Sequence, residues 1–220
     1  MPIQLTADGS HTIHSDKYDV AYHSIHGALK ETNHVFIDAG LRFKKATLTD
    51  IRILEVGFGT GLNVLATIAD NKAGSYELDF HTIEAYPITS EEVNQLNYHE
   101  HIDAIGKDEI IHLHNLPWDE KSKIHDRFTF TKHLRRLESF ESDLKFDIIY
   151  FDAFAPTAQP ELWETSILFK MYNLLNHNGI LVTYCAKGQF KRDLKSVGFE
   201  VQSIPGPPRK REMTRAIKSL

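Results

Sequence analysis

The chain has 220 residues, 41% of them hydrophobic and 25% charged, which is typical of one globular domain with at most a small appendage. No apolar run approaches the roughly 20 residues that a membrane-spanning helix needs, and the N-terminus lacks the basic and apolar segments of a signal peptide. A single cysteine, Cys185, excludes an internal disulfide framework, so we expect a reducing, cytoplasmic setting and no membrane partner.

The net charge of -5 is unevenly distributed along the chain. Residues 187–220 carry nine Lys and Arg against three acidic residues, a net charge of +6, so the rest of the chain sums to -11. A basic end on an acidic protein indicates a local anionic partner, although charge alone fits a solvated tail equally well.

Residues 1–50 are predicted to form an N-terminal extension that packs on the remaining domain. Residues 9–16 are typical of a short hairpin with a turn near Ser15-Asp16. Within residues 24–39, the apolar positions have a helical spacing for at least part of the segment.

Strand and helix patterns alternate over residues 51–220, the predicted main domain. The predicted helices are 62–69, one capped by Thr89 or Ser90, 160–175 and 190–197, and the strands are 51–56, 78–83, 123–131, 146–151, 180–184, 199–204 and 212–218. Residues 105–116 fit either a helix or a strand. The alternation predicts a doubly wound α/β sheet, mostly parallel. The last two strands have no helix between them, so we expect an antiparallel pair there, which is the usual plan of a class I methyltransferase.

A glycine-rich turn follows the first strand of this domain, in the order Glu55-Val56-Gly57-Phe58-Gly59-Thr60-Gly61. Glycines allow a tight turn and a close approach of the backbone to a ligand. The spacing differs from the G-x-G-x-x-G pattern that binds a pyrophosphate, and an acid beside the turn suits an ammonium group instead. S-adenosyl-L-methionine is therefore the predicted cofactor, bound by Glu55, Gly57, Phe58, Gly59, Gly61 and Asn63. The alternative is a structural turn with no cofactor.

Two more acids follow buried strands. Glu84 ends the second strand, where its carboxylate can accept both ribose hydroxyls of the cofactor. Asp152 follows the apolar strand 146–151, at the carboxyl edge of the sheet, where it would face the reactive methyl group. Alternatively, Glu84 is a surface residue, and Asp152 has a turn or cap role.

Further motifs resemble one family, the tRNA 5-methylaminomethyl-2-thiouridine methyltransferases. They occur in family order across nearly the whole chain: Asp8-Gly9-Ser10, Tyr22-His23-Ser24, Gly27-Ala28-Leu29, residues 55–63, Asp152-Ala153-Phe154-Ala155-Pro156, Gln159-Pro160-Glu161-Leu162-Trp163, Lys187-Gly188 and Arg209-Lys210-Arg211-Glu212-Met213. The segments at 152–156 and 209–213 are specific to this group rather than to methyltransferases in general.

The resemblance implies methyl transfer to the primary amine of 5-aminomethyl-2-thiouridine in the tRNA anticodon, with Asp152 as the catalytic residue beside that amine. Bifunctional members carry a second, FAD-dependent oxidase domain, for which this chain has no room, so we expect methylation only, downstream of separate proteins that install the aminomethyl group. The implied substrate-binding residues are Tyr22, His23, Ser24, Phe154 and Pro156, with Lys187, Arg209, Lys210 and Arg211 toward tRNA phosphates. Lys191, Arg192 and Arg215 extend this basic set, and Tyr22, Phe154 and Phe58 are candidates to stack on the base.

The chain departs from the family at two positions. Members often have Gly-Asp after the third strand, where an acid can meet the adenine, and this sequence aligns Lys132-His133 there. At the position of Cys185, relatives often have a small hydroxyl residue, and we interpret this cysteine as a packing residue.

Thirteen histidines raise the possibility of a metal site, with His112 and His114 on one face if their segment is a strand. No Cys cluster or His-Glu-x-x-His pattern accompanies them, so no metal is expected. The alternative functions are a methyl or aminopropyl transferase acting on a small amine, and a non-catalytic tRNA-binding protein with the same fold. The glycine spacing and the final strand pair disfavour a nicotinamide oxidoreductase.

Overall fold

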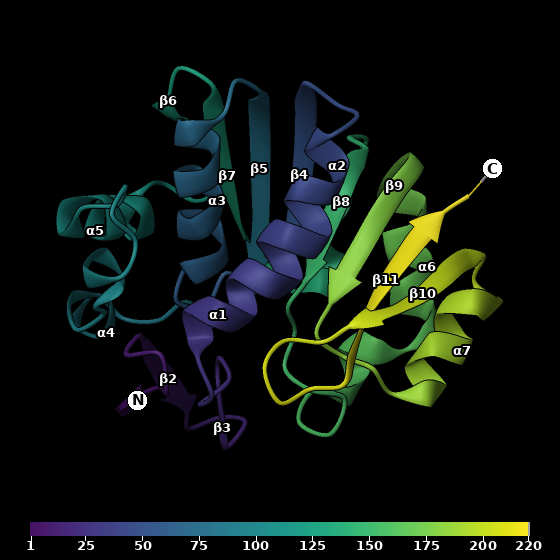
Figure 1. Cartoon of the computed structure of the whole chain (residues 1–220), viewed down its shortest axis with the longest axis horizontal. Coiled ribbons are helices and arrows are strands. Elements are labelled where there is room, and N and C mark those ends of the chain that lie inside the picture. Colours follow the sequence, from purple (N-terminus) through teal and green to yellow (C-terminus); the bar gives the residue numbers. More distant parts are fainter. Residues whose placement is uncertain (220) are drawn as a thin grey trace.

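The computed structural model describes residues 1–219, and its centre is an eight-stranded sheet in the order β10-β11-β9-β8-β4-β5-β7-β6 (Figure 1). The four central pairings, from β9 to β7, are parallel, and β6, β10 and β11 join antiparallel at the two edges. The strands are β4 (Asp50–Val56), β5 (Glu77–Glu84), β6 (Lys121–His125), β7 (Phe128–Leu134), β8 (Phe146–Phe151), β9 (Leu175–Thr183), β10 (Phe199–Pro205) and β11 (Glu212–Lys218). This confirms the predicted α/β class and the antiparallel last strand.

Both faces of the sheet are buried, so apolar side chains of the central strands point to both sides of it. Successive side chains alternate between the faces. Ile53 therefore packs in the cluster shared with the helices α3 and η1, while Leu54 packs in a second cluster with α6 and α7. Helices thus cover both faces of the sheet (Figure 1).

The helices occupy the crossovers that parallel strands require. They are α3 (Leu62–Ala73), α4 (Ser90–Asn94), α5 (Lys107–Asn115), α6 (Thr165–Leu174) and α7 (Gly188–Ser196), with short 3₁₀ turns η2 (Tyr98–Glu100), η3 (Leu137–Ser139) and η4 (Pro160–Trp163). Thr89 caps α4 in a capping box with Glu92, as one of the two predicted cap residues.

The N-terminal segment forms a small antiparallel sheet of β1 (Ile3–Leu5), β2 (His11–Ser15) and β3 (Val20–Ala21). It continues into α1 (Ala28–Thr32), the π-helical η1 (Asn33–Arg42) and α2 (Phe43–Lys45). Ile13, Val35 and Phe36 belong to the same hydrophobic cluster as the strands of the large sheet. The small sheet lies beyond the carboxyl ends of the central strands (Figure 1).

One local prediction needs correction, and one open alternative is settled. Residues 123–131 are not one strand, because the chain turns back between β6 and β7. The segment 105–116, which fitted either a helix or a strand, contains the helix α5 over Lys107–Asn115. The predicted turn near Ser15-Asp16 is present between β2 and β3, with Asp19 at a φ of 53°. The strand predicted over 180–184 begins earlier, because β9 starts at Leu175, and a register irregularity accommodates the positive φ of 60° at Asn178.

No helix within residues 1–219 is long and apolar enough to cross a membrane.

Candidate active site

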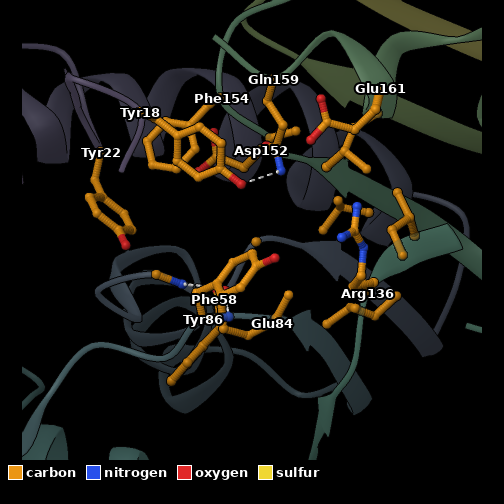
Figure 2. A pocket seen from close by; sticks show the side chains of 18 of the residues that line it. Tyr18, Tyr22, Phe58, Glu84, Tyr86, Arg136, Asp152, Phe154, Gln159 and Glu161 are labelled. Atoms are coloured by element: carbon orange, nitrogen blue, oxygen red, sulfur yellow. Dashed lines mark hydrogen bonds between the residues drawn. The ribbon is translucent and has the colours of Figure 1, made fainter. Parts of the chain in front are cut away.

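A cleft of about 800 Å³, open solvent included, lies at the carboxyl ends of β4, β5 and β8 (Figure 2). The glycine turn forms one wall, with positive φ angles of 92° at Gly57, 50° at Gly59 and 77° at Gly61. A Cβ at Gly57 would lie 2.9 Å from the Asp152 carbonyl oxygen, and a Cβ at Gly59 would lie 2.8 Å from the Tyr22 ring. The turn therefore needs glycine for its conformation and for the close approach of its neighbours.

Glu84 lies in this cleft and closes the glycine turn. One carboxylate oxygen accepts a hydrogen bond from the backbone N–H of Gly59 at 3.0 Å, and the other accepts from the N–H of Tyr86 at 2.8 Å. Each carboxylate oxygen can accept a second bond, so these contacts leave capacity for the two ribose hydroxyls.

Glu55 occupies a different position, completely buried on the α3 side of β4 and absent from the cleft lining. Its Oε2 accepts a hydrogen bond from Thr82 Oγ1 at 2.6 Å, and its Oε1 has no partner among the described residues. Burial raises the pKa of this carboxyl well above its ordinary value. An unpaired buried acceptor beneath the turn fits a ligand that brings a positively charged donor.

Asp152 lines the cleft directly after β8, and its orientation is fixed by a chain of hydrogen bonds. Asn63 Nδ2, from the first turn of α3, donates to Asp152 Oδ2 at 2.8 Å. Thr32 Oγ1 donates to Asn63 Oδ1 at 2.9 Å, which turns the amide nitrogen toward Asp152. Burial raises the pKa of Asp152 to about 7, and the hydrogen bond from Asn63 opposes that shift. The carboxyl group can therefore hold or release a proton near neutral pH.

Aromatic rings of the N-terminal segment line the same cleft as Asp152, with Tyr18 on the side of Phe154 and Asp152 (Figure 2). The ring centroids of Tyr18 and Tyr22 lie 4.8 and 5.0 Å from that of Phe154. The Tyr18 hydroxyl accepts a hydrogen bond from Gln159 Nε2 at 3.2 Å. This group can stack on a flat ligand and ties the N-terminal segment to the loop after β8.

Two predicted residues have side chains already engaged in the protein. The Phe58 ring is 4% exposed and packs on His114 and Phe130, so its side chain is not free to stack on a base. His23 Nε2 lies 2.8 Å from Thr60 Oγ1 in the glycine turn, and burial lowers the pKa of this imidazole to about 4. His23 is consequently neutral at pH 7 and holds the turn.

The loop after the third parallel strand differs from its predicted position. β7 continues to Leu134, and Lys132 is a buried strand residue whose ammonium donates to the His114 carbonyl. The segment that lines the cleft is instead Arg135, Arg136, Leu137 and Glu138. The loop that could meet the adenine therefore begins at Arg135, three residues after the predicted Lys132, because β7 continues beyond its apolar residues.

A second groove lies on the other side of the loop that follows β8. Its lining includes Pro156, Lys187, Lys210 and Arg211, four of the residues predicted to bind substrate, together with Tyr184. Lys187 and Arg211 are exposed. Residues of this loop line both hollows: Asp152 and Phe154 line the first cleft, and Pro156 lines the second groove.

Other predicted residues lie outside both hollows. The backbone N–H of Ser24 donates to Glu31 Oε2 at 3.1 Å, and Arg209 is exposed in the turn between β10 and β11. Lys191 is paired with Glu212 at 2.7 Å, and Arg215 packs over the Phe43 ring. The basic end is therefore only partly free for an outside partner.

The described residues contain no group of three or more His, Cys, Asp or Glu side chains arranged to hold a metal ion. His112 and His114 lie on a helix, so the shared strand face does not form. Cys185 is 5% exposed in the cluster that packs α6 and α7, which agrees with a packing role.

Several residues that line the hollows did not stand out in the sequence. They are Tyr18, Arg136, Gln159, Glu161 and Tyr184. Gln159 and Glu161 lie in the family-like segment Gln159-Pro160-Glu161-Leu162-Trp163, and that resemblance was the only sign in the sequence of a role in the site. Tyr18 and Tyr184 are ordinary residues whose roles depend on distant segments that meet only in the fold.

Comparison with known proteins supports a methyltransferase. A family described as S-adenosyl-L-methionine-dependent methyltransferase matches residues 119–219. Bifunctional proteins named for tRNA 5-methylaminomethyl-2-thiouridine biosynthesis, MnmC, from Ralstonia nicotianae and Cupriavidus metallidurans are each 32% identical over 97% and 96% of this chain. The chain spans 34% and 33% of their lengths, about a third.

Solved structures agree on the fold. The crystal structure of MNMC2 from Aquifex aeolicus superposes with a TM-score of 0.76 at 27% identity, over 97% of this chain and 68% of that one. The magnesium protoporphyrin IX methyltransferase of Synechocystis has a TM-score of 0.53 at 10% identity, over 87% of this chain and 84% of that one. The second likeness is one of fold alone.

Proposed function

We propose that this chain, which is similar to S-adenosyl-L-methionine-dependent methyltransferases and to part of the MnmC proteins, methylates the primary amine of 5-aminomethyl-2-thiouridine at the tRNA wobble position. The product would be 5-methylaminomethyl-2-thiouridine. The observation that carries the proposal is Asp152, a carboxyl with a pKa of about 7 that lies between the glycine turn and a group of aromatic rings.

Residues around the glycine turn fit the cofactor. Gly57 and Gly59 bring the backbone close to a ligand, and Glu84 retains acceptor capacity for ribose hydroxyls. Glu55 lies buried beneath the turn, and its unpaired Oε1 is proposed to supply a negative charge once the ammonium of the amino acid end binds and stabilises the ionised carboxylate. Asn63 donates a hydrogen bond from the same region to Asp152. S-adenosyl-L-methionine would supply a methyl group already activated on a sulfonium.

Asp152 is the proposed catalytic residue because an amine must be neutral to attack. A carboxylate whose pKa is near 7 can take one proton from the acceptor's ammonium and then hold the resulting amine by a hydrogen bond. Its bond from Asn63 keeps the carboxylate in one orientation. Alignment and exclusion of water would supply the remaining rate enhancement.

The acceptor side is proposed to use Tyr22 and Phe154 against the base, with Pro156 at the border of the second groove. The exposed cations Lys187, Arg209 and Arg211 are the proposed contacts to anticodon phosphates. A cytoplasmic setting, and separate proteins that install the aminomethyl group, complete the proposal.

Methylation of defined tRNA tests this function. The protein is incubated with labelled S-adenosyl-L-methionine and tRNA carrying 5-aminomethyl-2-thiouridine, and the nucleosides are resolved by mass. We expect 5-methylaminomethyl-2-thiouridine to appear with this tRNA and no product with a control tRNA that carries plain 2-thiouridine. Label transferred equally to both tRNAs, or only to small amines, would contradict the proposal.

The variant Asp152→Ala separates catalysis from cofactor binding. We expect turnover to fall by about 100-fold or more, a typical size for loss of a general base. The dissociation constant for S-adenosyl-L-methionine, measured by calorimetry, should change much less. Turnover near the parent value would remove Asp152 from the mechanism.

A further inference from the structure

Lys210, an exposed residue, places its ammonium group in a surface site that the protein itself forms. Its Nζ donates a hydrogen bond to Glu31 Oε1 at 2.6 Å and lies 4.4 Å from the centre of the Tyr184 ring. The Glu31 side chain is only 12% exposed, and its other carboxylate oxygen accepts the N–H of Ser24. A largely buried carboxylate beside the face of an aromatic ring is an arrangement that binds alkylammonium groups.

This ammonium site is connected to Asp152 through two short routes. The Tyr184 hydroxyl donates to the carbonyl oxygen of Ala153, the residue after Asp152, at 2.8 Å. On the other side, Glu31 precedes Thr32, which fixes the Asn63 amide that holds Asp152. The site therefore lies at the border between the groove lined by Tyr184 and Lys210 and the carboxyl group that the reaction needs.

The proposed acceptor has the same reactive group as a lysine side chain, a primary alkylammonium at neutral pH. The charge and the aromatic face that hold Lys210 attract any alkylammonium group, an aminomethyl group included. Lys210 lies in the turn between β10 and β11, next to the exposed Arg209 and Arg211 that face solvent. An RNA that binds these two cations is therefore in a position to displace the turn.

We propose that Glu31 and Tyr184 receive the ammonium group of the acceptor nucleoside on its way to Asp152, and that Lys210 occupies this site until the acceptor displaces it. Glu31 is then a substrate-binding residue that selects a primary amine, and Lys210 is an internal competitor. The inference rests on the proposed function and deepens it.

Electrostatics at Asp152 support the exchange. The charge of Glu31 raises the pKa of Asp152, while the ammonium of Lys210 lowers it. When Lys210 leaves, two neighbouring carboxyl groups lose their shared cation, and an incoming ammonium group restores it. A neutral base without the aminomethyl group cannot do so, which gives discrimination between modified and unmodified tRNA.

Two simpler roles for Lys210 predict different behaviour. If Lys210 only fastens the turn to α1, its removal should weaken substrate binding by loosening the groove. If it only contacts RNA phosphate, its removal should weaken binding of all tRNAs and lower the salt dependence of binding. Competition for an ammonium site predicts the opposite, a gain in binding that is restricted to tRNA with the amine.

The experiment compares binding of two tRNAs, one with 5-aminomethyl-2-thiouridine and one with plain 2-thiouridine, by the full chain and three variants. Glu31→Gln keeps the shape but removes the charge, and we expect it to lose about tenfold of the preference for the amine, the typical effect of one charge-assisted hydrogen bond. Lys210→Met should raise that preference severalfold. Lys187→Met, which removes a cation from the same groove, should weaken binding of both tRNAs alike.

The outcomes separate the two proposals. If the parent protein does not methylate the aminomethyl tRNA, the proposed function fails. If it does, but Glu31→Gln retains the parent's preference and kcat/KM, the inference about Glu31 is wrong. If Lys210→Met weakens the binding of both tRNAs, as Lys187→Met does, then Lys210 contacts phosphate or holds the turn against α1 and does not compete with the acceptor. Cofactor titration of each variant checks that it is folded.

Discussion

At the residue scale, Asp152 is the cleft side chain whose ionisation the fold places near neutral pH. Burial opposes its ionisation, and a single strong hydrogen bond from Asn63 partly offsets that penalty. The balance places its pKa at about 7, where small changes in the neighbouring charges of Glu31 and Lys210 alter its protonation.

We predict that kcat/KM for methylation rises as the pH increases through about 7. Below that pH, Asp152 is protonated in the free enzyme and cannot take the acceptor's proton, and above it the carboxylate can. A pH profile from 5.5 to 9 measures this. In Asp152→Asn the same limb should disappear, leaving only the ionisation of the acceptor amine. An identical profile in the variant would assign the limb to another group.

The same group also couples folding to pH. Its folded pKa lies above its ordinary value of 3.8, so the folded chain keeps a proton that the unfolded chain has lost. The free energy of unfolding should therefore contain a contribution that falls between about pH 4 and pH 7. We expect Asp152→Asn to lack this loss, and its Tm relative to the parent should increase between pH 5 and pH 8. A constant difference in Tm would mean that Asp152 ionises normally.

Gly59 provides a test of the glycine turn. Alanine there would strain a φ of 50° and place Cβ 2.8 Å from the Tyr22 ring. We expect Gly59→Ala to weaken S-adenosyl-L-methionine binding about tenfold or more, because strain and displacement together cost about 1–3 kcal/mol. Calorimetric titration measures the change. The control is Gly188→Ala, whose Cβ would meet only the flexible end of Arg192 at 3.4 Å. Equal effects would show that the turn has no special requirement.

At the element scale, the short helix α4 depends on its cap because five residues cannot sustain a helix alone. Thr89 and Glu92 exchange hydrogen bonds, and Glu92 also accepts the N-terminal ammonium of Met1 at 2.8 Å. The cap thus joins the start of the chain to the loop after β5.

Removing the cap should be measurable in stability alone. We predict that Thr89→Ala lowers the free energy of unfolding by about 1 kcal/mol, the usual cost of losing a threonine cap. Urea denaturation of the two proteins provides the measurement. Ser90→Ala serves as the matched control, since no side-chain bond of Ser90 is seen within residues 1–219. A similar loss in both variants would exclude a capping effect.

At the scale of the whole molecule, the two edges of the sheet differ in how their cations are paired. Arg209 and Arg211, in the turn between β10 and β11, and Lys187, in the loop before α7, are exposed and form no salt bridge among residues 1–219. Lys187 and Arg211 line the second groove. At the opposite edge, Lys123 on β6 is paired with Asp126. An anionic polymer should therefore approach from the β10–β11 side.

Salt dependence tests this orientation. We expect the logarithm of tRNA affinity to fall linearly with the logarithm of salt concentration, and the double variant Arg209→Gln with Arg211→Gln to reduce the slope by roughly 1.4–1.8 if both residues meet phosphates. Filter binding over a salt series measures the slopes. Lys123→Gln should leave the slope unchanged. Binding insensitive to salt in the parent would refute the assignment of these cations to RNA contacts.

Much of this architecture could be predicted from local patterns. The glycine turn, Glu84 and Asp152 each end an apolar strand, and parallel strands deliver their ends to one edge, so proximity follows from order alone. The misplacement at Lys132-His133 arises because β7 is paired on both sides, and such pairing extends a strand beyond its apolar residues. The single strand expected over 123–131 fails for another reason, because the chain turns back between β6 and β7 to form a hairpin.

The sequence by itself determined the cofactor turn, the α/β order and the acid at the end of β8, because these depend on contacts between near neighbours and on strand periodicity. Only the tertiary structure decided that Glu55 lies beneath the cleft rather than in it, that Phe58 is buried, and that Lys210 meets Glu31 across 179 positions. Which face of a strand a side chain takes, and which distant charge it meets, depends on how whole layers pack, and no local pattern contains that information.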